Sequence, residues 1–379
     1  MSGVPIIFDT DMSIDVDDVG ALCVAHALAD RGEANILAVV HGTGLPQGVG
    51  AISAINSYYG RDHIPIGAYR GPVGRPADTP GPDWTNHGAG WYVRALTERF
   101  PTHVRDYSDV EDATTVFRRS LAAAPGHKSV TIVSVGHATN LVALLRSRPD
   151  GVSPLSGVAL VKQKVRQLVW MGGSYWVKDR VEWNWGACGG PGVPNATTCG
   201  GYLPLGQLTA DAIQEWPAEV PTVFVSFDIG FWVRSGGVLK DGAPARSPCR
   251  QAYLEFCGGT GGSGGLPGWC DARGRNAWDL MAVVLAVRGT GRYYKLIPGT
   301  NRMDPQSGLN SWTDDQYDPW RAPREGFGHF QAWMPDSGIE YNATADEIDE
   351  LLLRLPTATP PPLPPPPPAL PPSPPPPPS

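Results

Sequence analysis

Short apolar segments alternate with segments of helical spacing along the first three quarters of the chain. The apolar runs, rich in β-branched residues, cover residues 5–8, 36–40, 64–68, 130–135, 167–171 and 222–227. Between them, Ala, Leu, Val and Ile recur at helical spacing over residues 17–29, 49–59, 113–123, 140–146 and 276–286. Strands that alternate with helices are typical of a parallel sheet covered by helices. The pattern therefore predicts an α/β fold with a doubly wound, mostly parallel sheet and helices on both faces.

Polar residues follow three of the predicted strands. Asp9 and Asp11 end the first strand, residues 136–140 follow the strand that begins at Val130, and residues 172–184 follow the strand that ends at Met171. In a doubly wound sheet, ligands bind at the carboxyl ends of the strands. We therefore expect these three segments to meet at one edge of the sheet and to form the site.

Three segments differ in composition from the predicted strands and helices, because they are rich in Gly, Pro and Cys or in Pro alone. Residues 186–206 and 235–275 are rich in Gly, Pro and Cys, which predicts insertions or long loops within a catalytic domain of residues 1–355. Residues 356–379 are almost wholly Pro with Ser, Ala, Thr and Leu. Such a segment cannot bury a core, so we expect a disordered polyproline tail that acts as a spacer or a docking segment.

Charge narrows the class of partner. The formal net charge is −7, and no run rich in Lys or Arg occurs. This balance speaks against nucleic acid or an anionic membrane as a partner and favours a small-molecule substrate. The sequence also lacks an apolar run of about 18 residues, so no membrane span is expected.

The compartment is left open by conflicting features. The first residues lack the pattern of a secretion signal, which favours the cytoplasm. Six cysteines, two glycosylation sequons at Asn195 and Asn342, and the proline-rich tail favour an extracellular or cell-wall protein whose N-terminus is incomplete. The cysteines are expected to form disulfides that staple loops, or to be free thiols in the cytoplasm, since their spacing matches no zinc site well.

A cluster of aspartates gives the first indication of chemistry. Five lie within ten residues at the end of the first predicted strand, at positions 9, 11, 15, 17 and 18. Five neighbouring carboxylates cannot all stay ionised unless protons or a cation offset their repulsion. Oxygen ligands favour a hard ion, and we expect Ca²⁺. The alternative is a helix N-terminus with acidic residues, which would explain Asp17 and Asp18 but not the other three.

These aspartates begin an ordered set of motifs that resembles the inosine-uridine preferring nucleoside hydrolases. The resemblance covers roughly residues 4 to 290, and each motif alone is weak. The matching segments are Asp9 to Asp11, Asp17 with Asp18, residues 55–67, residues 86–88 around His87, residues 135–141, residues 169–173, Glu182 to Asn184, and Trp278 with Asp279.

The resemblance implies a role for each matched residue. Family metal ligands correspond to Asp11, Asp18, Asp279 and the backbone carbonyl of Thr139. Asp11 would also act as the general base on metal-bound water. The remaining matches imply contacts to the substrate, from Asp17, Glu182 and Asn184 to ribose hydroxyls, and from Asn140 and Met171 at the same edge of the sheet.

The sequence departs from the family pattern mainly on the side of the nucleobase. The aspartate motif is two residues longer and carries Asp15, which is either an acid beside the metal or a solvated residue. Trp278 replaces the histidine that precedes the last aspartate in purine-active members, so it is expected to stack on the base. Trp176 replaces a family asparagine, and the tryptophans at 176, 183 and 185 form either an aromatic wall or ordinary packing.

Together these features predict an enzyme, an N-glycosyl hydrolase that uses Ca²⁺ to cleave ribonucleosides or related N-ribosides into base and ribose. Two alternatives stay open: a non-catalytic, wall-associated protein that binds metal and sugar, and a hydrolase of a different riboside. The family analogy implies a homodimer or homotetramer.

Overall fold

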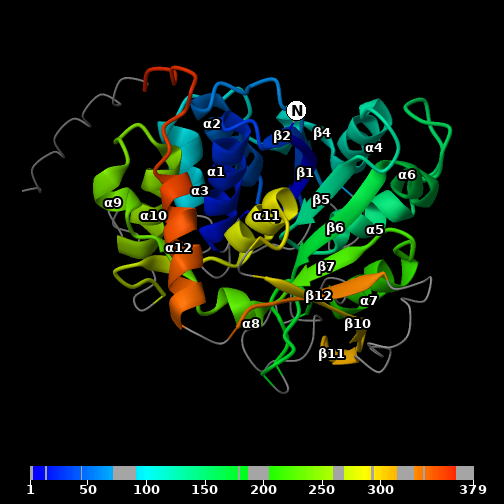
Figure 1. The fold of residues 1–379 in the computed structure, drawn as a ribbon. Coiled ribbons are helices and arrows are strands. Elements are labelled where there is room, and N and C mark those ends of the chain that lie inside the picture. The colour runs from blue at the N-terminus through cyan, green and yellow to red at the C-terminus, as the bar shows by residue number, and fades with distance from the viewer. Residues whose placement is uncertain are drawn as a thin grey trace, which may run out of the picture.

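The computed structural model describes residues 3–12, 15–43, 45–70, 91–177, 180–186, 205–258, 269–291, 294–313, 328–335 and 338–363. Its centre is a ten-stranded sheet (Figure 1) with the order β11-β10-β12-β7-β6-β5-β1-β2-β3-β4. The strands are β1 (Val4–Thr10), β2 (Ala34–His41), β3 (Ile66–Ala68), β4 (Glu111–Asp112), β5 (Val130–Ser134), β6 (Val165–Met171), β7 (Thr222–Val225), β10 (Lys295–Met303), β11 (Asn310–Thr313) and β12 (His329–Trp333). A separate antiparallel pair joins β8 (Arg234–Gly236) to β9 (Gly274–Asn276).

Helices cover both faces of the sheet. The helices packed on one face are α1 (Asp17–Asp30), α2 (Gln47–Tyr58), α3 (Trp91–Arg99), α10 (Pro248–Gly258), α11 (Trp278–Arg288) and α12 (Gly338–Leu352). The helices on the other face are α4 (Ala113–Ala123), α5 (Thr139–Leu145), α6 (Gly157–Lys164) and α7 (Leu205–Glu215). Two short helices, α8 (Phe227–Gly230) and α9 (Leu239–Gly242), follow β7 and β8.

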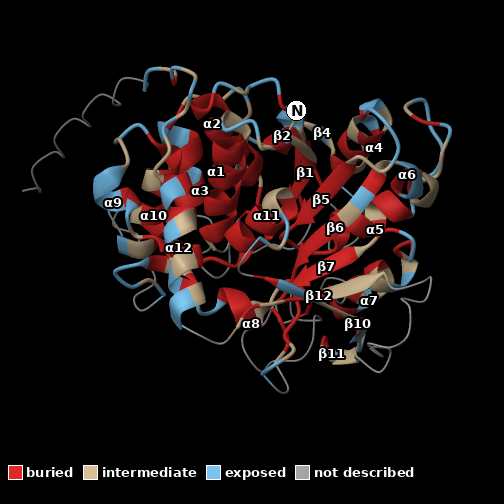
Figure 2. Ribbon diagram, in the orientation of Figure 1, coloured by how far each residue is buried: buried red, intermediate tan, exposed pale blue. Residues whose placement is uncertain are grey.

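Alternation along β1 explains the two layers. Ile6 and Phe8 pack into the core under α1 and α11, whereas Ile7 packs into the core under α4 and α5. Successive side chains of a strand point to opposite faces, so a strand that is apolar at every position requires cover on both sides. The buried residues of Figure 2 accordingly run through the central strands and through the faces of the helices that contact them.

The sheet order reverses beside β1, and this reversal positions the site. The chain runs outward from β1 through β2, β3 and β4, then returns to place β5 on the other side of β1, followed by β6 and β7. All these strands are parallel to their neighbours. The segments that leave the carboxyl ends of β1 and β5 therefore diverge and leave a crevice between them.

The structure confirms the predicted fold class and differs from the predictions at the C-terminal side. Strands β10 and β11 are antiparallel to their neighbours and were not predicted. The segment 235–275, expected to be an insertion or a long loop, contains the eleven-residue helix α10. The single catalytic domain of residues 1–355 stays a prediction, and residues 187–204 and 364–379 of the expected insertion and tail lie outside the described residues.

Two disulfides form within the described residues, which decides between the two alternatives for these four cysteines: they are neither free thiols nor metal ligands. Cys23 in α1 pairs with Cys249 at the start of α10, and Cys257 at the end of α10 pairs with Cys270. Cys188, Cys199 and the sequon at Asn195 fall outside the described residues, whereas Asn342 is exposed on α12. Among the described helices, none is long and apolar enough to cross a membrane.

Candidate active site

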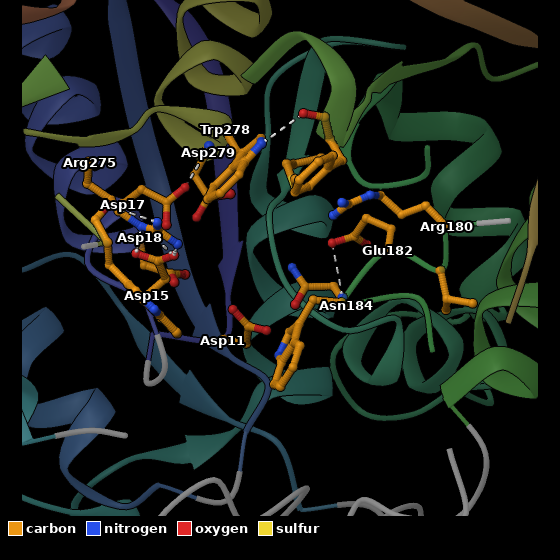
Figure 3. A pocket seen from close by; sticks show the side chains of 15 residues that line it. Asp11, Asp15, Asp17, Asp18, Arg180, Glu182, Asn184, Arg275, Trp278 and Asp279 are labelled. Carbon is orange, nitrogen blue, oxygen red and sulfur yellow. Dashed lines mark hydrogen bonds and ion pairs between the residues drawn. The ribbon is translucent and has the colours of Figure 1, made fainter. Parts of the chain in front are cut away.

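A cavity of about 240 Å³ opens at the carboxyl ends of the central strands (Figure 3). One side of it is acidic and comes from the end of β1 and the starts of α1 and α11. The other side comes from the segment that follows β6. The lining residues are Asp11, Asp15, Asp17, Asp18, Met171, Arg180, Val181, Glu182, Trp183, Asn184, Phe227, Trp269, Arg275, Trp278 and Asp279.

Three buried carboxylates converge at the acidic side. Asp17 and Asp18 lie in the first turn of α1, and Asp279 lies in the first turn of α11. Each offers an oxygen within 4.8 Å of those of the other two. The two helices pack against each other, and the backbone N–H of Asp279 donates to Asp17 Oδ2 over 3.3 Å. The helix packing therefore holds together carboxylates that are far apart in the sequence.

The group of Asp17, Asp18 and Asp279 has the properties of a cation site. Burial raises the pKa of all three carboxyls well above the ordinary value, and the neighbouring aspartates raise it further. Neither α1 nor α11 uses an aspartate side chain as its N-cap, so helix capping does not explain the cluster. A hard divalent ion would offset the repulsion with the oxygen ligands it prefers. The donor set fits such an ion.

Asp11 lies between the acidic group and the opposite side of the cavity (Figure 3). It is 3% exposed, and burial together with repulsion from Glu182 and Asp17 raises its pKa well above the ordinary value. Its Oδ2 is 3.3 Å from Nε2 of the buried His137, whose Nδ1 is 3.2 Å from the backbone oxygen of Asn184. Burial lowers the pKa of His137 to about 4, so this histidine is a neutral neighbour of Asp11 at physiological pH.

A glycine makes room for Asp11. A Cβ added to Gly136 would lie 2.7 Å from the backbone nitrogen of Asp11 and 2.8 Å from its Cβ. Such distances are shorter than ordinary van der Waals contact, so a side chain here would displace the aspartate. Gly136 follows β5, the strand that pairs with β1, and the pairing brings its backbone against Asp11.

Asp15 forms an ion pair that the sequence did not reveal. Nε of Arg275, on β9, is 2.9 Å from both carboxylate oxygens of Asp15. The guanidinium also lies 4.9 Å from the ring centroid of Trp278 and 5.0 Å from that of Trp269. Asp15 is thus not a freely solvated residue, because its charge is matched by an arginine that also lines the cavity.

Glu182 and Asn184 lie across the cavity from the three converging carboxylates. Asn184 donates from Nδ2 to the backbone oxygen of Val135 over 2.9 Å, and its N–H donates to Glu182 Oε1 over 3.2 Å. Burial raises the pKa of Glu182 to about 7. Its Oε2 has no hydrogen-bond partner among the described residues. A buried oxygen without a partner in a cavity is suited to bind a ligand hydroxyl.

Trp278 faces another aromatic ring. It stacks on Phe227 with ring centroids 5.2 Å apart, and its indole N–H donates to the backbone oxygen of Phe227 over 2.9 Å. The three tryptophans of the 176–185 region have different environments. Trp185 is fully buried against Trp170 and Phe224, Trp183 lines the cavity, and Trp176 is 42% exposed.

Most of the predicted site residues lie at the cavity, and two do not line it. Asp11, Asp17, Asp18, Met171, Glu182, Asn184, Trp278 and Asp279 line it, whereas Asn140 and Thr139 do not. Asn140 donates to Asp9 Oδ1 over 2.8 Å, and Thr139 Oγ1 is 3.2 Å from the backbone oxygen of Gly42. His87 falls outside the described residues.

Arg180, Val181, Phe227, Trp269 and Arg275 line the cavity without having been predicted as site residues, whereas Trp183 was expected either there or in ordinary packing. Arg180, Val181 and Trp183 are close in the sequence to the predicted residues Glu182 and Asn184. This closeness was the signal from which their position at the cavity could have been predicted. The positions of Phe227, Trp269 and Arg275 depend on contacts between segments far apart in the chain, which no local pattern encodes.

Solved structures with the same architecture include nucleoside hydrolases. A plant nucleoside hydrolase aligns at 17% identity over 92% of this chain and 98% of its own, with a TM-score of 0.62. The inosine-uridine preferring nucleoside hydrolase of Bacillus anthracis aligns at 15% identity over 92% and 99%, with a TM-score of 0.56. An inosine-guanosine nucleoside hydrolase aligns at 16% identity over 91% and 98%, with a TM-score of 0.56. These likenesses establish the fold.

Sequence comparison matches one part of the chain to a family. Comparison with the curated proteins finds no significant match. The family model of inosine-uridine preferring nucleoside hydrolases matches residues 6–187, which include Asp11, the two aspartates of α1, Glu182 and Asn184. Over residues 6–187 the chain therefore matches the inosine-uridine preferring nucleoside hydrolases, a family of N-glycosyl hydrolases.

Proposed function

We propose that this protein hydrolyses the N-glycosidic bond of a ribonucleoside or a related N-riboside and releases the base and the sugar. The observation that carries the proposal is the composition of one cavity. Four buried aspartates, Asp11 among them, lie on one side of it, and a buried glutamate with an asparagine lies on the other. A sugar between the two sides would have carboxylates at its anomeric carbon and hydrogen-bonding groups at its hydroxyls.

The acidic side is proposed to bind Ca²⁺. The proposed ligands are Asp11, Asp18, Asp279 and the backbone carbonyl of Thr139. Asp17, whose carboxylate lies within 4.8 Å of those of Asp18 and Asp279, is proposed to hold a ribose hydroxyl. When bound, the ion would make a water molecule more acidic and bind ribose hydroxyls. The support for a cation is the mutual proximity and burial of Asp17, Asp18 and Asp279.

Asp11 is the proposed general base. It lies in the cavity beside a neutral histidine, and burial favours transfer of a proton to its carboxylate. In the reaction, the oxygen of water bonds to the anomeric carbon while Asp11 takes the proton of that water. The bond from the anomeric carbon to the base nitrogen breaks, and the electron pair leaves with the base. The surrounding carboxylates stabilise the positive charge that develops on the sugar.

The leaving base is not protonated by Trp278. An indole N–H is not an acid at physiological pH, and here it is already donated to the backbone oxygen of Phe227. The stacked pair of Trp278 and Phe227, flanked by the guanidinium groups of Arg275 and Arg180, instead supplies an aromatic surface of the cavity that a base can contact. The proton that the base requires therefore comes from water or from a group other than Trp278.

Release of free base from purified ribonucleosides tests the function. We expect Asp11→Asn to lower kcat by at least about 100-fold, because general-base catalysis contributes about that much or more. Asp241→Asn, which removes an exposed carboxylate on α9, is the matched control and should keep the wild-type rate. Equal rates for Asp11→Asn and the wild type would contradict the assignment of Asp11. Ribose binding by the wild type without any base release would favour a non-catalytic sugar-binding protein.

A further inference from the structure

Two arginines line the cavity, and they differ in how their charges are matched. Arg275 is paired with Asp15 through Nε and also donates to the backbone oxygen of Trp269. Arg180 is half-buried, and among the described residues no carboxylate lies within 4.0 Å of its guanidinium nitrogens. A cation that lines a cavity without a carboxylate partner is available to bind an anionic ligand.

Stacking holds the guanidinium of Arg180 in place. Its central carbon lies 4.2 Å from the ring centroid of Phe227, which in turn stacks on Trp278. An arginine held face-on against an aromatic ring keeps its N–H groups directed outward in the plane of the guanidinium. Those donors can then form two parallel hydrogen bonds to the oxygens of one anion.

The position of Arg180 indicates which part of a riboside it would meet. Figure 3 shows Arg180 beside Glu182 and Asn184, across the cavity from Asp15, Asp17 and Asp18. In the proposed function, the anomeric carbon and the ribose hydroxyls held by the ion and by Asp17 lie at the acidic side. The C5′ substituent then extends away from the aspartates and towards the segment that carries Arg180 and Glu182.

We propose that Arg180 binds a 5′-phosphate and that the substrates of this protein are nucleoside 5′-monophosphates, an inference that rests on the proposed function. A phosphate at C5′ can accept two hydrogen bonds from the guanidinium group of Arg180. It also stays distant from the carboxylates of the acidic side, which would repel it. The products are then the free base and ribose 5-phosphate. Water supplies the new oxygen at the anomeric carbon, and the phosphate ester remains intact.

Glu182 is compatible with a phosphate nearby. Burial raises its pKa to about 7, so a large fraction of it carries a proton near neutral pH. A protonated carboxyl can donate a hydrogen bond to an oxygen of the 5′ substituent instead of repelling it. The N–H of Asn184 donates to the other carboxyl oxygen and fixes its orientation.

The kinetic test compares uridine, uridine 5′-monophosphate and orotidine, which carries a carboxylate on its base. We expect the wild type to have the highest kcat/KM for the monophosphate. Arg180→Ala should lower the ratio of kcat/KM for the monophosphate to that for uridine by about 10- to 100-fold, the range of a charged hydrogen bond. Arg148→Ala, which removes an exposed arginine, should leave this ratio unchanged. A preference for uridine, a preference for orotidine, or an unchanged ratio in Arg180→Ala would overturn the proposal.

A binding measurement separates this inference from the proposed function. Calorimetry with Ca²⁺ present compares ribose 5-phosphate with ribose on the wild type and on Arg180→Ala. We expect about tenfold or tighter binding of the phosphate on the wild type and loss of most of that difference in the variant. This result without turnover of any substrate would refute the hydrolase function and support the phosphate site. Equal affinities for the two sugars would overturn the phosphate site even if nucleosides are hydrolysed.

Discussion

At the scale of single residues, neighbouring aspartates have different partners and therefore different roles. Asp9 accepts hydrogen bonds from Ser134 and Asn140 and joins β1 to β5 and α5. Asp15 pairs with Arg275. Asp17 and Asp18 converge with Asp279 and fit a cation. The carboxylates of the motif are thus divided between joining the strands, pairing with Arg275 of β9 and forming the proposed cation site.

Removing one carboxylate of the cation site should change stability in opposite directions with and without the ion. We expect Asp279→Asn to raise the unfolding free energy of the chelator-treated protein by about 1 kcal/mol or more, since each pKa unit of repulsion relieved is worth about 1.4 kcal/mol. The rise in Tm on addition of Ca²⁺ should shrink in the same variant, because a ligand is lost. Thermal unfolding with and without Ca²⁺ measures both effects, with Asp241→Asn as the control. An undiminished Ca²⁺-induced rise would exclude Asp279 as a ligand.

The sequence predicts the cavity residues whose positions depend on local order along the chain. Asp11 directly follows β1, and Glu182 and Asn184 lie in the segment that leaves β6; the carboxyl ends of these strands share an edge, so the meeting of the three residues could be expected. The pairing of Asp15 with Arg275 joins residues separated by 260 positions and depends on where β9 lies. Nothing in the spacing of either residue encodes that contact.

At the scale of elements, helix α10 and its two disulfides connect the aspartate helix to the cavity wall. Cys249 joins the start of α10 to α1, and Cys257 joins its end to Cys270, which is next to the cavity residue Trp269. Tyr253 of α10 packs so closely on α1 that a Cβ at Gly20 would lie 2.4 Å from its hydroxyl oxygen. The helix therefore supports both the acidic side and the aromatic side of the site.

Loss of the second disulfide should destabilise this wall. The bond closes a sequence separation of 13 residues, for which the chain-entropy relation gives about 3 kcal/mol. We expect Cys257→Ser with Cys270→Ser to lower the unfolding free energy by roughly that amount, measured by denaturant unfolding. Mild reduction of the wild type should produce a similar loss. An unchanged unfolding midpoint in the double variant would show that α10 is held by packing alone.

The elements with strong apolar periodicity were predicted, and those fixed by distant contacts were not. Apolar runs in the sequence predict the central strands β1, β2, β5 and β6 directly. Helix α10 contains Cys, Arg and Gln and lies between Gly-rich segments, so its composition resembles a loop. Strand β10 contains Pro298 and Gly299, which disfavour a strand, and its identity comes from pairing with β12.

At the scale of the whole molecule, buried titratable groups should make stability depend on pH. Carboxyls with raised folded-state pKa values stabilise the protein at low pH, and this contribution is lost as pH rises through those values. They include Asp9 and Glu182, both at about 7, and the aspartates of the cation site. Three buried histidines and the partly buried His329 have lowered pKa values, about 3 for His26 and about 4 for His41, His137 and His329. These histidines destabilise the protein at low pH, which opposes the effect of the carboxyls. They do so only below the pKa of histidine in the unfolded chain, about 6.5.

Above about pH 7 only the buried carboxyls should therefore determine how the stability changes with pH. We expect the Tm of the chelator-treated protein to fall between about pH 7 and about pH 8.5, as the buried carboxyls lose their protons. Ca²⁺ should reduce this fall, because the ion replaces the protons as the balancing charge. Thermal unfolding across this range, with and without Ca²⁺, measures the effect. A Tm that is constant or rises in the absence of the ion would contradict the account of the cluster.

The central claim is that one cavity joins a cation site to a riboside site for hydrolysis. Its most direct test is the release of free base from a panel of ribonucleosides and their 5′-monophosphates, followed by chromatography, with added Ca²⁺ and after chelation. The account predicts release from at least one member of the panel, its loss on chelation by at least about 100-fold, and its recovery when Ca²⁺ is restored. Base release that persists undiminished after chelation, or no release from any member while Ca²⁺ binds, would contradict it.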